Sequence, residues 1–195
     1  MMALDVGMTA ATDDALLALY AAGDAQAARE LARRFLPRTL AYARRMLGDA
    51  AEAEDVAQEA MLRLWRMAPG WRSGEAQVST WLWRVVANLC TDRLRRRRGV
   101  GLDTVPDPED PSPTALQGLV AANRAAALET ALALLPDRQR QAVVLRHLED
   151  LPNPEIADIM GISVEAVESL TARGKRALVA RLSGQRESLG YDHDD

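Results

Sequence analysis

The 195-residue sequence predicts an all-α protein, in which an acidic, Pro-rich linker joins two small helical domains. Hydrophobic residues make up 48% of the chain, which is ample for a core, but only 4% of residues are aromatic. Alanine and leucine dominate, and both favour helix. Residues branched at Cβ are sparse and rarely alternate with polar residues, as they would in strands.

The first domain is expected over residues 12–98. Thr12 is suited to cap the first helix, because two acidic residues follow it. Gly48 ends the second helix, and Pro69-Gly70 follows the third. The four helices are expected over residues 12–22, 25–47, 52–67 and 79–98.

The clearest boundary is the linker, residues 99–118, which carries four prolines and four acids. Proline fixes its own φ and restricts the preceding residue, so an extended linker is expected here and no helix. The second domain is predicted over residues 119–184, followed by an acidic tail over 185–195. Its helices are expected over residues 119–135, 137–148, 154–160 and 164–182.

Charge is segregated along the chain, although the formal net charge is only −4. Residues 84–98 carry six arginines and one aspartate, and residues 163–186 carry five basic and two acidic side chains. Two basic helical segments separated by an acidic linker suggest two contacts with one polyanion, although solvated helix faces are the alternative.

Several features predict a cytoplasmic protein without membrane insertion. The single cysteine, Cys90, excludes an internal disulfide framework and fits a reducing compartment. No apolar run approaches the ~18–20 residues that span a bilayer. The N-terminus lacks the basic and then apolar pattern of a signal peptide.

Residues 153–178 have the pattern of a helix-turn-helix. Asn153 and Ser163 can cap the two helices, and Gly161 permits the sharp turn between them. Projection of the second helix at 100° per residue gives a buried side with Val167, Leu170, Gly174 and Leu178. The outer side carries Glu165, Ser169, Ala172, Arg173 and Arg176, with Lys175 on the flank. Such a face suits base edges and phosphates, whereas an ordinary helical hairpin would leave it solvated.

The helix over residues 79–98 is amphipathic in an unusual way. Its predicted buried side holds Leu82, Val86, Leu89, Cys90 and Leu94. Its other side holds Trp81, Arg84, Val85, Asn88, Thr91 and Arg95. A tryptophan among cationic and amide groups fits base stacking, with packing at a helix junction as the alternative. Arg96, Arg97 and Arg98 close the helix and are expected to attract phosphate.

Three motifs, in this order and spacing, carry a resemblance over residues 12–184. They are AEDVAQEAMLRLW (residues 53–65), STWLWRVVANLCTDRLRRRR (residues 79–98) and LPDRQRQAVVLRHLEDLPNPEIADIMGISVEAVESLTARGKRAL (residues 135–178). Together they resemble the extracytoplasmic-function (ECF) sigma factors of bacterial RNA polymerase. The first domain would be similar to sigma domain 2 and the second to sigma domain 4.

The resemblance implies three binding surfaces and an anti-sigma factor that masks the DNA-binding domains. The core polymerase would be bound by Asp55, Gln58, Glu59 and Leu62. The −10 promoter element would be bound by Trp71, Arg72, Ser79, Trp81, Arg84, Asn88, Thr91, Arg95 and Arg96, with a flipped base received by the loop over residues 71–79. The −35 element would be bound by Glu165, Ser169, Ala172, Arg173, Lys175 and Arg176.

Other functional classes fit less well. A helix-turn-helix regulator that acts without the polymerase would need a receiver or ligand domain, and the N-terminal half lacks alternating strands and helices. An enzyme is not expected, because the sequence has no Gly-rich phosphate loop and no metal-ligand spacing, and neither of its two histidines has a plausible set of partners. No cofactor, metal or small-molecule substrate is therefore predicted.

Overall fold

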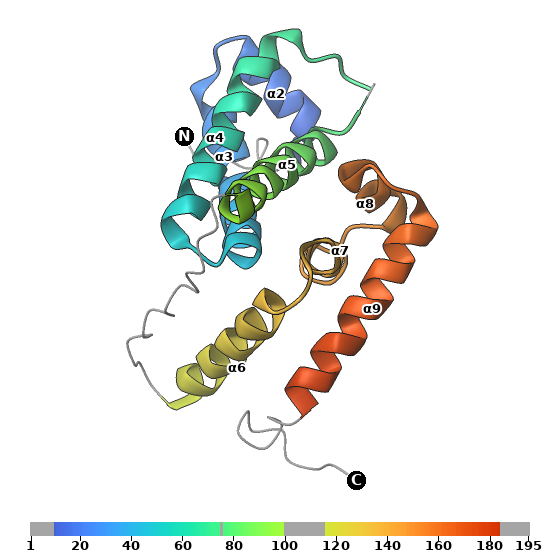
Figure 1. Ribbon diagram of the computed structural model, residues 1–195. Coiled ribbons are helices and arrows are strands. Elements are labelled where there is room, and N and C mark those ends of the chain that lie inside the picture. The colour runs from blue at the N-terminus through green and yellow to red at the C-terminus, as the bar shows by residue number, and fades with distance from the viewer. Residues whose placement is uncertain (1–9, 75, 100–115, 184–195) are drawn as a thin grey trace. The chain divides into compact units, whose positions relative to one another are not determined.

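The computed structural model describes residues 10–74, 76–99 and 116–183, and its named elements are all helical (Figure 1). The chain divides into two compact units. One holds the helices up to α5, and the other is built around α6, α7 and α9, with α8 joined to them in the chain. The predicted all-α class with two helical domains is confirmed.

The N-terminal unit consists of four α-helices and one short 3-10 turn. They are α2 (Asp13–Ala21), α3 (Ala25–Leu47), α4 (Ala50–Met67), η1 (Ala68–Gly70) and α5 (Val78–Gly99). Local chemistry sets their ends: Thr12 and Asp49 accept hydrogen bonds from the backbone N–H groups of Ala15 and Glu52. Gly48 ends α3 with a φ of 66°, a conformation that glycine adopts without strain.

The core of this unit lies where α3 packs against α2, α4 and α5. Trp83 of α5 is 1% exposed, and its ring meets that of Tyr42 edge to face with 5.5 Å between centroids. The guanidinium of Arg38 lies 5.3 Å from the centroid of Trp83, within the range of a cation–π contact. Two segments 41 residues apart in the sequence are thereby fixed to each other.

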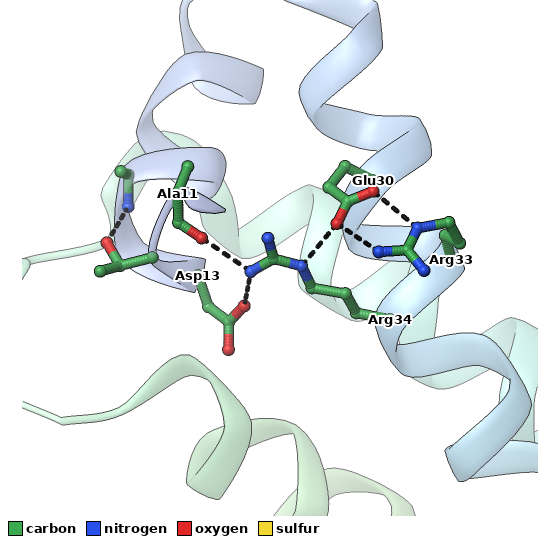
Figure 2. A network of polar contacts seen from close by, with 7 residues as sticks. Ala11, Asp13, Glu30, Arg33 and Arg34 are labelled. Atoms are coloured by element: carbon green, nitrogen blue, oxygen red, sulfur yellow. Dashed lines mark hydrogen bonds and ion pairs between the residues drawn. The ribbon is translucent and has the colours of Figure 1, made fainter. Parts of the chain in front are cut away.

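A polar network ties the start of α2 to α3 (Figure 2). Arg34 donates to the Ala11 carbonyl and to Asp13, both at 2.8 Å, and to Glu30 at 2.7 Å. Arg33 donates to Glu30 as well, at 2.7 Å. Hydrogen bonds from Arg33 and Arg34 lower the pKa of the Glu30 carboxyl to about 2, so it remains charged near neutral pH. The short helix α2 is therefore fixed by specific bonds as well as by apolar packing.

The C-terminal unit contains a helix-turn-helix, as predicted. Its elements include α6 (Leu116–Ala133), α7 (Asp137–His147) and α9 (Val164–Leu182), and α8 (Asn153–Met160) precedes the turn into α9. Gly161 has a φ of 62° at the turn, and the Ser163 hydroxyl accepts from the Ala166 N–H at 3.2 Å to cap α9. Both α6 and α7 pack against α9.

A buried arginine closes the end of α6. Arg140 of α7 is 8% exposed and donates to the carbonyls of Leu132, Ala133 and Leu135 at 2.9, 2.6 and 3.2 Å. The last carbonyls of a helix have no i+4 partner within it, so the guanidinium adds donors at the end of α6. The Leu132 carbonyl also accepts from the Leu135 N–H at 3.0 Å. No local pattern in the sequence predicts the Arg140 contacts.

Helix boundaries differ from the predictions at a few positions. α6 begins at Leu116, inside the predicted linker, because the last proline of that segment is Pro113 and the helix tolerates Gly118 in its first turn. α6 ends at Ala133 and not at 135, since Pro136 disfavours helical backbone in the residue before it. Most of the predicted linker (100–115) and the acidic tail (184–195) lie outside the described residues. Within the described residues, no helix is long and apolar enough to cross a bilayer.

Candidate nucleic-acid interface

One side of α5 forms a polar stripe, defined here as Trp81, Arg84, Asn88, Thr91 and Arg95. These residues recur every three or four positions, so they share one side of the helix. Trp81 is half-buried and the other four are exposed. The stripe therefore offers an aromatic ring, an amide, a hydroxyl and two cations to a ligand.

The opposite side of α5 packs into the core, with two exceptions to the prediction. Leu82, Val86 and Cys90 are at most 1% exposed, as expected. Leu89 and Leu94 are only half-buried. The predicted amphipathic pattern is correct for most of the helix and weakens towards its C-terminal end.

The arginines that close α5 do not share one role. Arg95 and Arg96 are exposed, as phosphate contacts require. Arg97 instead donates to the Leu47 carbonyl at 2.8 Å and forms an ion pair with Glu52 at 3.0 Å. It ties the end of α5 to the junction of α3 and α4, so the expectation that it attracts phosphate does not fit its contacts.

This difference predicts that substitution of Arg97 lowers stability, whereas substitution of Arg96 changes the salt dependence of DNA binding. Arg97→Ala removes a partly exposed ion pair and a carbonyl bond, so we expect a loss of about 1 kcal/mol in the free energy of unfolding. Arg96→Ala should leave stability unchanged but reduce the slope of log affinity for DNA against log salt by about one. Urea unfolding and DNA titrations at several salt concentrations test both. Equal stabilities for the two variants would contradict the assignment.

Three further predicted residues lie before α5 or in its first turn. The indole Nε1–H of Trp71 donates to Asp14 of α2 at 2.7 Å, and the ring is half-buried. Arg72 is exposed, and Ser79 is half-buried in the first turn of α5. From the sequence, Asp14 is expected only to begin a helix, because its contact with Trp71 spans 57 positions and leaves no local pattern.

The outer side of α4 combines acidic, polar and apolar groups. Asp55, Gln58 and Leu62 are exposed, and the leucine side chain is 46% exposed. Glu59 accepts a hydrogen bond from Arg63 at 2.8 Å, which lowers the pKa of its carboxyl. The four residues predicted to bind the core polymerase thus share one side of the helix, with an apolar side chain at one end.

The helix α9 presents all six of its predicted DNA-binding residues to solvent. These are Glu165, Ser169, Ala172, Arg173, Lys175 and Arg176. The Arg173 Nε donates to the Ser169 carbonyl at 3.3 Å, which leaves the other guanidinium donors for a ligand. On the other side Val167, Gly174 and Leu178 are buried, whereas Leu170 is only half-buried.

Gly174 allows α9 to approach α7 closely. A Cβ at this position would lie 2.5 Å from Val143 Cγ2, closer than real Cβ atoms come, and 3.3 Å from the Gln139 carbonyl oxygen, which is a tight contact. Helical glycine normally costs stability relative to alanine, so the residue is explained by this contact. The close packing of α9 against α7 fixes the orientation of the outer side of α9.

We therefore expect Gly174→Ala to destabilise the C-terminal unit by about 1–3 kcal/mol, despite the better helix propensity of alanine. The stiff Val143 side chain cannot swing away freely. Hydrogen exchange in α7 and α9 measures the effect. The double variant with Val143→Ala should recover part of the loss, and no recovery would show that the Val143 contact is not the cause.

Two observations concern metal and thiol chemistry among the described residues. No group of three or more His, Cys, Asp or Glu side chains there is arranged to hold a metal ion. Burial raises the pKa of the Cys90 thiol to about 12, so the thiolate is not available near neutral pH. The prominent features are surfaces for macromolecules.

Known protein families match both helical units of this chain. Residues 31–100 match the family Sigma-70 region 2, and residues 125–178 match Sigma-70, region 4. The ECF RNA polymerase sigma factor SigM of Mycobacterium tuberculosis is 37% identical over 179 residues, which cover 89% of this chain and 85% of SigM. SigW of Bacillus subtilis, also an ECF RNA polymerase sigma factor, is 32% identical over 71% of this chain and 79% of its own.

Two solved structures have a similar fold. CnrH in complex with the cytosolic domain of CnrY has a TM-score of 0.66 and 26% identity, covering 88% of this chain and 97% of the solved chain. The fold is also similar to that of the sigma factor RpoE from Bartonella quintana, solved with the anti-sigma factor NepR, with a TM-score of 0.62 and 21% identity over 80% of this chain and 96% of RpoE. The two helical units, their outward polar surfaces and these relatives show that the chain belongs to the ECF RNA polymerase sigma factors.

Proposed function

We propose that this chain binds core RNA polymerase and directs it to promoters through their −10 and −35 elements. It would then promote melting of the DNA. The observation that carries the proposal is the placement of the predicted residues on the outer sides of α4, α5 and α9, within segments matched by sigma regions 2 and 4. In this proposal the residues 99–118 link a −10 and core-binding domain (12–98) to a −35-binding domain (119–184).

The helix α9 would read the −35 element in the major groove. Arg173 and Arg176 can donate to the O6 and N7 atoms of guanine, and Glu165 can accept from the N4 amine of cytosine. The pKa of Glu165 is lowered by backbone and Ser163 hydrogen bonds, so its carboxylate is charged and can only accept. Lys175, on the flank, would contact phosphate.

A guanine contact by Arg173 has a measurable consequence. Arg173→Ala should weaken binding to the −35 element by about 1–3 kcal/mol and relax preference at one base pair. Arg181→Ala is a matched control, because this exposed arginine of α9 is not among the predicted contacts and donates to the Leu134 carbonyl. Anisotropy titrations with single-base variants provide the measurement. A uniform loss over all sequences would make Arg173 a phosphate contact.

The polar stripe of α5 would engage the −10 element as the duplex opens. Melting requires no covalent chemistry, but extrusion of a base costs a few kcal/mol that the protein must offset. Stacking on an aromatic side chain is worth roughly 1–3 kcal/mol per base. Trp81 and Trp71 would supply such surfaces, and Arg84, Arg95 and Arg96 would hold the phosphates.

The outer side of α4 would dock on the core polymerase. Leu62 supplies apolar contact area, and the acidic and amide groups of Asp55, Gln58 and Glu59 favour a basic partner. Size-exclusion chromatography of the purified chain with core RNA polymerase tests this step. We expect a stable complex, and separate elution at micromolar concentrations would contradict it.

The proposal includes an anti-sigma factor that masks the DNA-binding surfaces. It is supported by RpoE, whose solved complex contains the anti-sigma factor NepR. The proposed place of action is the cytoplasm, where bacterial polymerase transcribes. The sigma family is not a class of enzymes in general, and we propose that this chain has no catalytic activity of its own.

A further inference from the structure

The first turn of α2 carries two adjacent carboxylates with different partners. Asp13 accepts from Arg34 of α3 at 2.8 Å, as Figure 2 shows. Asp14 accepts from the indole Nε1–H of Trp71 at 2.7 Å. One turn of helix is therefore bonded to the core helix α3 and also to the beginning of the segment that leads into α5.

The position of Asp14 is set by the fold of the N-terminal unit. Leu16 and Leu17 of α2 are fully buried, and α2 also packs against η1, which directly precedes Trp71. Arg34 in turn is bonded to Glu30, whose side chain is almost fully buried. Asp14 thus belongs to a fixed frame, although it lies before the residues matched by sigma region 2.

An indole has one N–H donor and no acceptor, and a bond to a carboxylate is among the stronger hydrogen bonds. With this donor engaged, Trp71 has only its ring to offer to a base. Rings stack on any base, whereas a free N–H would select an acceptor. The contact with Asp14 therefore bears on how Trp71 can recognise DNA.

We propose that Asp14 is a positioning residue for promoter opening, which holds the Trp71 indole so that Trp71 contacts the melted strand by stacking. This inference rests on the proposed function, because that function assigns Trp71 to the −10 element. Asp14 itself would not touch DNA. Its carboxylate oxygen would act as an acceptor, and its negative charge would not be essential.

The bond can be tested without polymerase, by the ¹H–¹⁵N resonances of the four indole N–H groups. The Trp71 resonance is assigned by its absence in Trp71→Phe. Asp14→Ala should shift this resonance and speed its exchange with water, whereas Asp14→Asn, which keeps an acceptor oxygen, should retain slow exchange. Asp13→Asn is the matched control and should leave the Trp71 resonance in place. The other indole resonances report whether each variant is folded.

The functional test measures the rate of open-complex formation with core polymerase on a duplex promoter. We expect Asp14→Ala to slow opening about three- to tenfold, the size that the loss of one typical hydrogen bond implies. Asp14→Asn should open at nearly the wild-type rate. Trp71→Phe should be slowed to a similar extent, and the double variant Asp14→Ala/Trp71→Phe should be no slower than Trp71→Phe alone.

The outcomes separate the two levels of the proposal. Suppose that Trp71→Ala is folded, as unshifted resonances of the other indole N–H groups would show, and opens promoters normally. The assignment of Trp71 to the −10 element then fails, and the positioning role of Asp14 fails with it. If Trp71→Ala slows opening but Asp14→Ala does not, only the positioning role is overturned. Full additivity in the double variant, or an equal loss in Asp14→Asn and Asp14→Ala, also overturns it.

Discussion

Arg140→Met should destabilise the C-terminal unit by about 3 kcal/mol or more. The substitution keeps an apolar stem of similar length but leaves the carbonyls of Leu132, Ala133 and Leu135 without the guanidinium. The Leu132 carbonyl keeps the hydrogen bond from the Leu135 N–H, at 3.0 Å, but a buried acceptor that loses its partner costs about 1–3 kcal/mol. Since α6 packs on α9, loss of these hydrogen bonds should also loosen the outer side of α9, which we propose contacts the −35 element.

Hydrogen exchange in α6, α7 and α9 measures the effect within the full chain. Arg138→Met is the matched control, because Arg138 is an exposed arginine two positions earlier in the same helix. Arg140→Lys should recover only part of the loss, since a lysine lacks the planar fork that reaches several carbonyls at once. Equal stability of Arg140→Met and Arg138→Met would refute the capping role.

Trp83→Ala should destabilise the N-terminal unit by about 3–5 kcal/mol, the range for an aromatic side chain removed from a core. Trp83 is 1% exposed and contacts both Tyr42 and Arg38. Its removal would leave a cavity between α5 and α3 and weaken their packing. Because α5 carries the polar stripe, promoter opening should be lost together with stability.

Trp81→Ala provides the matched comparison on the same helix. This ring is half-buried on the polar side, so we expect a smaller loss of stability and a larger effect on promoter opening at a temperature where the variant is folded. Hydrogen exchange in α3–α5 and open-complex kinetics separate the two. The assignment of core and surface on α5 would be wrong if Trp81→Ala lost more stability than Trp83→Ala and had the smaller effect on promoter opening.

Local chemistry explains why much of the fold could be predicted from the sequence. Thr12, Gly48 and Ser163 act within three or four residues of their own positions, and the helix ends that they define agree with the prediction. The stripe of α5 and the outer side of α9 follow from helical periodicity, and most of their residues lie where that periodicity puts them.

The contacts that were missed join residues far apart in the chain or depend on an exact approach of two helices. Trp71 meets Asp14 across 57 positions, and Arg97 meets the Leu47 carbonyl across 50. Nothing in a single sequence distinguishes Arg97 from the arginines beside it, because helix packing decides which of them faces inward. The sequence places Gly174 on the buried side of α9, but only the structure shows that Val143 requires its lack of a side chain.

The central claim is that this chain gives core polymerase its promoter specificity. The most direct measurement is transcription in vitro from genomic DNA fragments of its own bacterium, with 5′ ends sequenced with and without the purified chain. We predict new start sites that appear only when chain and core are combined and that share spaced −10 and −35 sequences. If the chain binds DNA alone and adds no start site to those of the core, it acts as a regulator without the polymerase and the account is contradicted.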